Sequence, residues 1–467
     1  MSVGLVLVHA LLLVLAACGC TARGTLNHGY TLDLDAEPRL VCTFFCPFSF
    51  VPPASLHLTK QQTRLHASSH QRWKAIVRDV LARTEWNATY GSLARKIDAT
   101  YRTVGCTAAC RAELETLFRT NYPDQYDELV FVPFHSPHRP SVPITTSTDS
   151  HTVVCVAATH PHRGIAEVFA EAGHGAVDAR ELAAWQYYYE VAHVARGAGP
   201  VPDAFGCTSA LAVDARGTVH HGRNLDIPAA DDYRRTAAHV AWRRGGRALF
   251  ATAQNVAENV GVATGVAAAA GLSFSYNWRR DAADAAVAST PALLRCLHSS
   301  DNSGSNNNDT MVGAPLASFV RTLFERGVEG ERAAAVLATR RMCAPAYIAV
   351  GTRRAGVVLT RNSTHSLAPR AVARGTAAWH VSQANYDHYR AQPPTDDRLG
   401  LAEAAFDALG RAEGASRRGV WRVLSVRGNG VSRGVLNSDT VYSAYMRPGD
   451  GTMEDVLRDS TDANTLD

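Results

Sequence analysis

The sequence has little net charge, few lysines and almost no long apolar stretches, and these shortages limit the class of protein. Its 467 residues include 47 basic and 43 acidic side chains, so the formal net charge is only +4. Nucleic-acid binding usually leaves a strongly basic surface, and we therefore expect no nucleic-acid partner. Arginine far outnumbers lysine, which we attribute to genomic composition and not to phosphate recognition. The sequence contains no internal repeat.

The one long apolar stretch lies at the start of the chain. Residues 3–17 are apolar and uncharged, which is the length of a signal-peptide core and too short for a comfortable membrane span. Small residues follow at 16–19, so we expect a signal peptide over residues 1–20. An alternative is a bacterial lipoprotein box at Leu15-Ala-Ala-Cys18, which would place a lipid on Cys18. No later segment approaches the roughly 20 apolar residues of a transmembrane helix.

Potential glycosylation sites agree with secretion. The Asn-x-Ser/Thr triplets begin at Asn87, Asn308 and Asn362. Together with the expected signal peptide, they predict that the protein enters the secretory pathway.

Ten cysteines in a secreted chain indicate disulfides, for which Cys42/Cys46 and Cys106/Cys110 are the local candidates. Sequence alone leaves their connectivity open. The two closely spaced pairs and the histidines of residues 133–163 also raise the question of zinc. Their spacing fits neither a ribbon nor a finger, and no His-Glu-x-x-His pair is present. We therefore expect no metal and no cofactor.

The chain changes character near its middle. With 46% apolar and 19% charged residues it can bury a substantial core. Periodicity predicts helices over 71–127 and 164–193, an edge strand at Tyr30–Asp35, and a linker at 197–203. From residue 207 onward, alternating segments predict hairpins, and helical patterns recur at 316–340, 396–413 and 417–426. Blocks of strands and helices predict an α+β fold with antiparallel sheets, divided into a mostly helical segment 21–206 and a segment 207–467.

The stretch from Cys207 to Asp226 predicts a β-hairpin, because apolar and polar residues alternate on both sides of the turn at 214–217. A hairpin returns Arg223 and Asp226 to the neighbourhood of Cys207. A thiol beside a guanidinium and a carboxylate is suited to be a nucleophile. The alternative is that Cys207 is a small buried apolar residue and that Arg223 and Asp226 form a solvated strand end.

A nucleophile at the start of a strand also suggests how the thiol could be activated. If the backbone were cut before Cys207, the freed α-amine could serve as the base. An amine with a reference pKa near 8 is roughly matched to a thiol near 8.5, so proton transfer between them is easy. Gly206 offers an unhindered carbonyl for attack by the thiol.

Several motifs in order resemble the family of acid ceramidase and N-acylethanolamine acid amidase, which are N-terminal nucleophile hydrolases. The similar segments are Cys207-Thr-Ser, His221-Gly-Arg-Asn-Leu-Asp226, Ala344-Pro-Ala-Tyr347, Asn385-Tyr-Asp387, Asp396-Asp-Arg398 and Thr440-Val-Tyr442. Near the N-terminus, Tyr30–Asp35 and Arg72-Trp73 also resemble this family, with an insertion at about 40–70 between them.

The resemblance implies a four-layer αββα fold with a helical N-terminal subunit, and cleavage between Gly206 and Cys207 into two chains that stay associated. It implies hydrolysis of lipid N-acyl amides in an acidic compartment such as the lysosome, with a lipid-presenting protein or a membrane surface as a possible partner. Ala344-Pro-Ala-Tyr347 favours ceramide as the substrate, and His221–Pro228 favours N-acylethanolamine as the alternative. Between the two, we rank ceramide first.

The resemblance also implies roles for individual residues. Cys207 would attack the amide carbonyl, and its own amine would carry the proton. Asp226 would orient that amine, and Arg223 would steady the thiolate. Asn385 would donate to the oxyanion, where losing one donor costs roughly 10²–10³ in rate. Arg398 would support the site, with the pair Asp396-Asp397 as its partner.

One departure from the family pattern stands out. The family usually has Asn-Glu-Arg where this chain has Asn277-Trp-Arg279, so Trp278 replaces an acidic residue of the catalytic network. A lipid-binding protein without turnover is therefore an alternative. No cysteine follows Cys343, so the C-terminal disulfide of ceramidases is missing. A serine lipase, suggested by Gly430-Val-Ser-Arg-Gly434, is excluded because no histidine follows the serine.

Overall fold

The computed structural model describes residues 29–33, 64–65, 72–129, 164–175, 177–198, 206–228, 230–244, 247–255, 259–279, 288–298, 315–429 and 432–458. The expected signal peptide, Cys18, the pair Cys42/Cys46 and Asn308 lie outside these ranges. Among the described residues, no helix is both long enough and apolar enough to cross a membrane.

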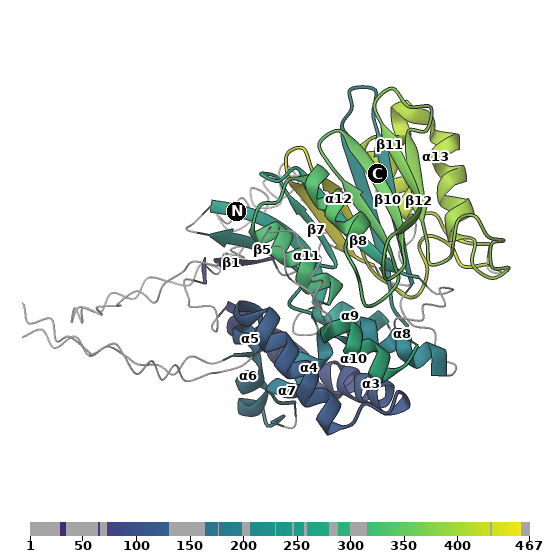
Figure 1. Ribbon diagram of the computed structural model, residues 1–467. Helices are drawn as coiled ribbons and strands as arrows, with labels where there is room; N and C mark the ends of the chain where they lie inside the picture. The colour runs from purple at the N-terminus through teal and green to yellow at the C-terminus, as the bar shows by residue number, and fades with distance from the viewer. Residues whose placement is uncertain are drawn as a thin grey trace, which may run out of the picture.

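The segment before Cys207 is helical, as its periodicity predicts. In chain order it contains α2 (Arg72–Arg83), the 3-10 helix η2 (Trp86–Ala88), α3 (Tyr90–Thr103), α4 (Ala108–Asn121), α5 (Pro123–Leu129), α6 (Ile165–Glu171), α7 (Ala179–Trp185) and α8 (Tyr188–Ala198). The predicted pair Cys106–Cys110 is a disulfide and closes the turn between α3 and α4. Figure 1 shows α3–α7 gathered into one helical lobe below the sheets.

The described strands form two sheets. The larger has the order β11-β10-β9-β8-β7-β6-β5-β1-β2, and the smaller has the order β12-β3-β4-β13-β14. Their bounds are β1 Gly29–Asp33, β2 Arg64–Leu65, β3 Gly206–Val213, β4 Val219–Asp226, β5 Ala237–Arg244, β6 Arg247–Asn255, β7 Thr264–Ala267, β8 Leu272–Trp278, β9 Ala346–Gly351, β10 Ala355–Arg361, β11 Ser366–Ala373, β12 His380–Gln383, β13 Thr440–Arg447 and β14 Thr452–Leu457.

The predicted antiparallel pairing holds except at one end of the larger sheet. There β1 pairs in parallel with both β5 and β2. The prediction that Tyr30–Asp35 is an edge strand is therefore wrong, because the short β2 covers its outer side. A strand from the N-terminal segment is thus built into the sheet of the C-terminal segment.

The two sheets stack face to face, and helices cover both outer faces (Figure 1). Leu211 and Val219 of the smaller sheet pack against Val358 and Ala349 of the larger one. On the outside, α13 (Arg398–Gly414) and α14 (Arg417–Leu424) pack on the smaller sheet. The larger sheet is covered by α11 (Leu316–Glu325) and α12 (Gly330–Thr339). This arrangement confirms the α+β fold with αββα layers.

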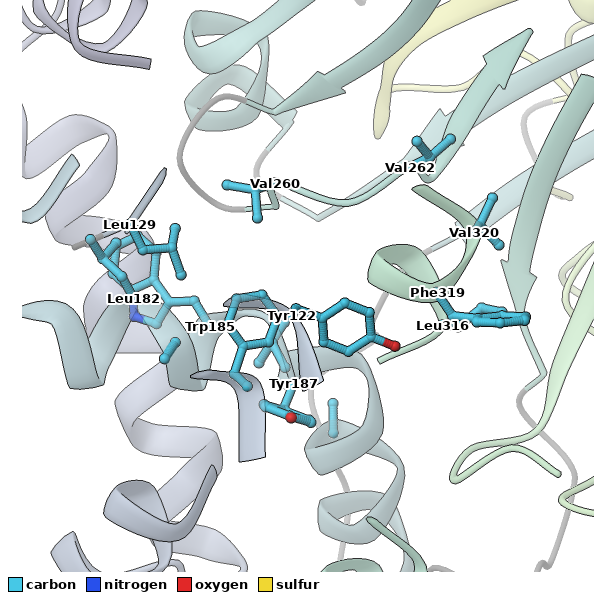
Figure 2. Packing of buried hydrophobic residues seen from close by; sticks show 14 of the residues in the cluster. Tyr122, Leu129, Leu182, Trp185, Tyr187, Val260, Val262, Leu316, Phe319 and Val320 are labelled. Carbon is cyan, nitrogen blue, oxygen red and sulfur yellow. The ribbon is translucent and has the colours of Figure 1, made fainter. Parts of the chain in front are cut away.

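The helical lobe is fixed to the sandwich by a buried ion pair and an apolar boundary. Arg321 of α11 binds Glu128 of α5 through two hydrogen bonds of 2.6 Å, and neither side chain is exposed. Figure 2 shows side chains of the lobe, among them Trp185 and Tyr187, on one side of this boundary, with Val260 and Leu316 on the other. The two segments therefore share one hydrophobic core.

Several elements were not predicted from the sequence. They are α9 (Ala230–Thr236), α10 (Thr290–His298), β11 and β14. A second disulfide joins Cys296 of α10 to Cys343, across a separation of 47 residues. Spacing alone could not reveal this pairing, because the fold brings the two cysteines together.

Candidate active site

Hairpin β3–β4 places its side chains on two opposite faces. Cys207 pairs with Leu225, and Ser209 pairs with Arg223, in an antiparallel register. Because successive side chains of a strand alternate, Cys207 and Arg223 lie on the face toward the larger sheet. Asp226 pairs with Gly206 on the opposite face, toward α13. The predicted hairpin is confirmed, and we call these its inner and outer faces.

On the inner face the Cys207 thiol meets a cation. Arg223 Nη2 donates to Cys207 Sγ over 3.1 Å, while its Nη1 donates to the carbonyl of Ala263. Cys207 and Arg223 are 2% and 1% exposed. Burial alone would lower the pKa of Arg223, but the nearby Cys207, Tyr442 and Tyr276 outweigh burial and raise it. The guanidinium therefore places a positive charge directly beside the sulfur.

On the outer face Arg398 holds several groups together. From the start of α13, its Nη1 donates to the carbonyl of Cys207 at 2.9 Å and to Asp226 Oδ2 at 3.0 Å. Asp396 binds Arg398 with both carboxylate oxygens, and Thr440 Oγ1 donates to Asp226 Oδ1. Burial opposes its charge, but Asp396 and Asp226 raise the pKa of Arg398. Arg398 therefore joins the backbone of Cys207 to two carboxylates.

The pair Asp396-Asp397 divides in the structure. Asp396 binds Arg398, as expected, whereas Asp397 accepts a hydrogen bond from Gln392 instead. Thr440, the first residue of the motif Thr440-Val-Tyr442, provides the second hydrogen-bond partner of Asp226.

Asn385 lies against the backbone nitrogen of Cys207. Its Oδ1 accepts hydrogen bonds from Cys207 N and from Arg398 Nη2, both at 2.8 Å, and its Nδ2 donates to the carbonyl of Trp278. In the uncut chain, the atom that contacts Cys207 N is therefore Asn385 Oδ1. Asp226 contacts the same centre through Arg398.

Gly206 sits in a space too small for a side chain. An added Cβ would lie 3.0 Å from Asp226 Cβ and 3.2 Å from Arg398 Nη1. Glycine at this position lets the backbone approach the outer-face network closely. The sequence indicated only that its carbonyl is unhindered.

Between the sheets, the inner face continues as a buried polar network. Ser209 Oγ contacts Ser275 Oγ at 2.8 Å and donates to Asn277 Oδ1. His221 contacts the hydroxyls of Ser273 and Ser275 through its two ring nitrogens. Burial, followed by Arg223, lowers the pKa of His221 to about 3, so the ring is neutral. These bonds fix the hairpin on the larger sheet.

A pocket opens beside the Cys207 thiol. It encloses about 760 Å³ between atoms, part of which is open to solvent. Its wall is mainly apolar, with aromatic and some polar side chains, and it comes from both segments of the chain: Trp185, Tyr188, Tyr189 and Glu190 precede the linker, while Arg223, Gln254, Tyr276, Trp278 and Tyr442 follow it. The periodicity assigned residues 185–190 only to a helix over 164–193.

Comparison with known proteins gives matches over about half of the chain. No family model matches the sequence. The chain is 31% identical over 248 residues to the N-acylethanolamine-hydrolyzing acid amidase of Oryctolagus cuniculus. This match covers 51% of this chain and 60% of that protein. It is 26% identical over 271 residues to the acid ceramidase of Homo sapiens, covering 55% and 63% respectively. These partial matches support the resemblance to the family of acid ceramidase and N-acylethanolamine acid amidase.

The similarity to these family members is partial. The matched regions span about three fifths of the length of the relatives. Among solved structures, a Caenorhabditis elegans N-acylethanolamine-hydrolyzing acid amidase ortholog matches with a TM-score of 0.44 and 24% identity, over 54% of this chain and 100% of that one.

Trp278, the departure from the family pattern, is part of the pocket wall. Its ring is 1% exposed, stacks on His193 with centroids 3.8 Å apart, and meets Tyr189 edge-on. Its flanking residues keep polar roles, because Asn277 binds Ser209 and Arg279 binds Asp387. The substitution therefore replaces a carboxylate by an apolar surface and leaves the backbone contact to Asn385 in place.

Two of the three potential glycosylation sites lie in the described part of the chain. Asn87 is exposed in η2. Asn362 is half-buried in the turn between β10 and β11, where its Oδ1 accepts hydrogen bonds from the backbone of Thr364 and His365.

Proposed function

We propose that the chain is an amidohydrolase for lipid N-acyl amides, with Cys207 as a nucleophile that becomes N-terminal by self-cleavage after Gly206. The observation that carries the proposal is the contact of Arg223 with Cys207 Sγ, together with Asn385 at Cys207 N, beside a pocket. The names of its relatives, N-acylethanolamine-hydrolyzing acid amidase and acid ceramidase, supply the substrate class.

Self-cleavage needs no group from outside the chain except water. Cys207 Sγ attacks the carbonyl carbon of Gly206, the C–N bond breaks, and the nitrogen of Cys207 takes the thiol proton to become an amine. The acyl group is then held as a thioester. Water adds to the thioester, which leaves a carboxylate on Gly206 and restores the thiol. The absence of a side chain at Gly206 supports this step, because the backbone just before Cys207 lies directly against Asp226 and Arg398.

In turnover the freed amine takes the proton of the thiol as Sγ attacks the substrate amide. Arg223 stabilises the thiolate. Asn385 is proposed to donate to the oxyanion, for which its Nδ2 must exchange the Trp278 carbonyl for the substrate oxygen. Asp226 and Arg398 position the new amine from the outer face. The leaving amine departs with a proton, and water releases the fatty acid from the thioester.

Ceramide and N-acylethanolamine differ in the amine that leaves. Ala344-Pro-Ala-Tyr347 keeps ceramide as the first expectation, while the higher identity to N-acylethanolamine-type relatives supports the ethanolamide. Hydrolysis of both substrates should be measured side by side at acid pH with matched acyl chains. A clear preference for the ethanolamide would reverse this order.

The second candidate is a lipid-binding protein without turnover, which Trp278 favours because it removes a carboxylate from the network. Acid incubation followed by gel electrophoresis separates the two. We expect wild type to give two fragments, one beginning at Cys207, while Cys207→Ala stays intact. Arg216→Gln in the exposed turn of the same hairpin is the matched control and should be cut like wild type. If wild type stays uncut and inert at every pH tested, the hydrolase proposal fails.

The proposed setting is the secretory pathway, ending in an acidic lysosome or outside the cell. Both segments would remain associated after cleavage, which the buried pair Arg321–Glu128 supports. A membrane surface or a lipid-presenting protein would deliver the substrate. Co-purification of the two fragments in physiological salt tests the association.

A further inference from the structure

The pocket contains a buried carboxyl group that the proposed chemistry does not use. Glu190 of α8 lines the same pocket as Cys207 and is 2% exposed. Its Oε1 accepts a hydrogen bond of 3.0 Å from Leu316 N, at the first turn of α11. This bond fixes one carboxyl oxygen and thereby sets the direction of the other.

The other oxygen, Oε2, is buried and has no hydrogen-bond partner among the described residues. A second group in the pocket wall is similar. Gln254 of β6 is 2% exposed, and its Nε2 also lacks a partner in the described part of the chain, while its Oε1 accepts from Thr252. Leaving a buried polar group unpaired is costly, so two such groups in one pocket indicate a polar ligand.

The charge state of Glu190 suits a ligand that is a neutral hydroxyl group. Burial raises the pKa of Glu190 to about 7, although hydrogen bonds from the backbone of Leu316 and of Glu190 itself act to lower it. Below that pH its carboxyl is neutral and can both donate and accept. The ionisable groups around it are tyrosines whose pKa values Glu190 in turn raises (Tyr101, Tyr122, Tyr187 and Tyr189), together with His193 one turn further along α8 and, across the pocket, Arg223 and Cys207.

We infer that Glu190 and Gln254 form a subsite that binds a hydroxyl group of the amine released from the substrate. The inference rests on the proposed amidase function. A hydroxyl both donates and accepts, which matches a carboxyl on one wall and an amide NH₂ on another. Because Glu190 precedes the cleavage point, the N-terminal segment contributes directly to substrate recognition.

Paired substrates that differ by one hydroxyl test this subsite. The first pair is an N-acylethanolamine and the N-acylpropylamine with the same acyl chain, and the second is ceramide and its 1-deoxy analogue. The readout is the ratio of kcat/KM within each pair at acid pH. For wild type we expect the hydroxylated member of at least one pair to be preferred by about ten- to a hundredfold, which is the effect of leaving one buried hydrogen-bonding group unpaired.

Three variants locate the origin of this preference. Glu190→Leu should bring the ratio close to one. Glu190→Gln keeps an oxygen for Leu316 N and an NH₂ that can donate to the hydroxyl, so it should retain part of the preference and guards against a folding defect in the leucine variant. Tyr187→Phe removes a buried hydroxyl beside α8 that does not line the pocket, and it should leave the ratio unchanged.

The outcomes separate this inference from the proposed function. If wild type hydrolyses no member of either pair, the amidase function itself fails. If wild type hydrolyses both members of each pair equally well, the hydroxyl subsite is refuted and the function stands. An unchanged ratio in an active Glu190→Leu or in Gln254→Leu would likewise overturn the subsite.

Discussion

The two faces of hairpin β3–β4 each contain a buried arginine, and the two arginines are neutralised differently. On the outer face, Arg398 has two carboxylate partners, Asp226 and Asp396. On the inner face, Arg223 has no carboxylate partner among the described residues, and it binds a carbonyl and the Cys207 thiol. The paired cation holds the structure, whereas the inner cation keeps its charge available for the thiolate. Burying Arg223 without a carboxylate partner lowers the stability of the fold, and the proposed chemistry uses the charge of this side chain.

The largest effect is expected from the inner face itself. Cys207→Ala removes the nucleophile and should lower amide hydrolysis by at least about 10³ and prevent cleavage. Ser443→Ala provides the outer-face comparison, because it deletes two buried hydrogen bonds, one to Asn224 and one from Arg458. We expect it to be cut normally and to lose about 1–3 kcal/mol of unfolding free energy. A Cys207→Ala chain that is still cut before residue 207 would exclude the thiol as the attacking group.

The second prediction contrasts the two arginines directly, in a Cys207→Ala background that should remain one chain. Arg398→Leu removes the charged partner of buried Asp226 and should cost about 3–5 kcal/mol of unfolding free energy. Arg223→Met removes a cation that has no carboxylate partner in the described structure, so it should cost less than about 1 kcal/mol or stabilise the protein. Urea titrations of both variants measure this difference. Equal losses would mean that both arginines are structural.

The adjacent residues His220 and His221 lie on opposite faces of the hairpin, so the pH dependence of stability also compares the two faces. The pKa of inner-face His221 is lowered to about 3, whereas that of outer-face His220 is lowered mainly by burial. Below the unfolded pKa near 6.5, the unfolded chain gains a proton that folded His221 refuses. Stability should therefore fall with pH from about 6.5 toward 3, by about 1.4 kcal/mol per pH unit.

Two variants measure this pH dependence in the uncut background. In His221→Asn the unfolded chain takes up one proton fewer than in wild type. The slope of unfolding free energy against pH should therefore be smaller by about 1.4 kcal/mol per pH unit between about pH 6.5 and 3. His220→Asn should also reduce the slope below about pH 6.5, because burial lowers the pKa of folded His220. Identical slopes in wild type and His221→Asn between pH 6 and 4.5 would show that His221 takes up a proton in the folded state.

The smallest effect concerns geometry on the inner face. Arg223→Lys keeps the charge but loses the planar guanidinium, whose two Nη atoms donate to the Ala263 carbonyl and to Cys207 Sγ at the same time. We expect about a tenfold loss in kcat/KM with little change in stability. The matched outer substitution, Arg398→Lys, should lower stability more than activity. If Arg223→Lys retains full activity, a point charge near the thiol is sufficient.

Local sequence patterns predict most of the fold but only part of the site. The helices before residue 199 and the hairpin follow from periodicity, because each element buries one face. Arg223 and Asp226 are three residues apart on one strand, so the alternation of side chains already implies that they lie on opposite faces of the hairpin. No local pattern places Arg398 or Asn385 beside Cys207, because α13 and the loop after β12 reach it only through the packing of the layers. The same holds for Glu190, which local periodicity assigned simply to a helix.

The parallel strand β1 affects how the protein can refold after cleavage. It belongs to the N-terminal segment but pairs along its full length with β5 of the C-terminal segment. If the chain is cut before Cys207, this strand becomes part of a separate polypeptide, and the linker no longer keeps it close to its partner. Refolding then requires two chains to meet, so its rate should depend on concentration. Cleavage would make folding a one-time event that must be finished before the enzyme becomes active.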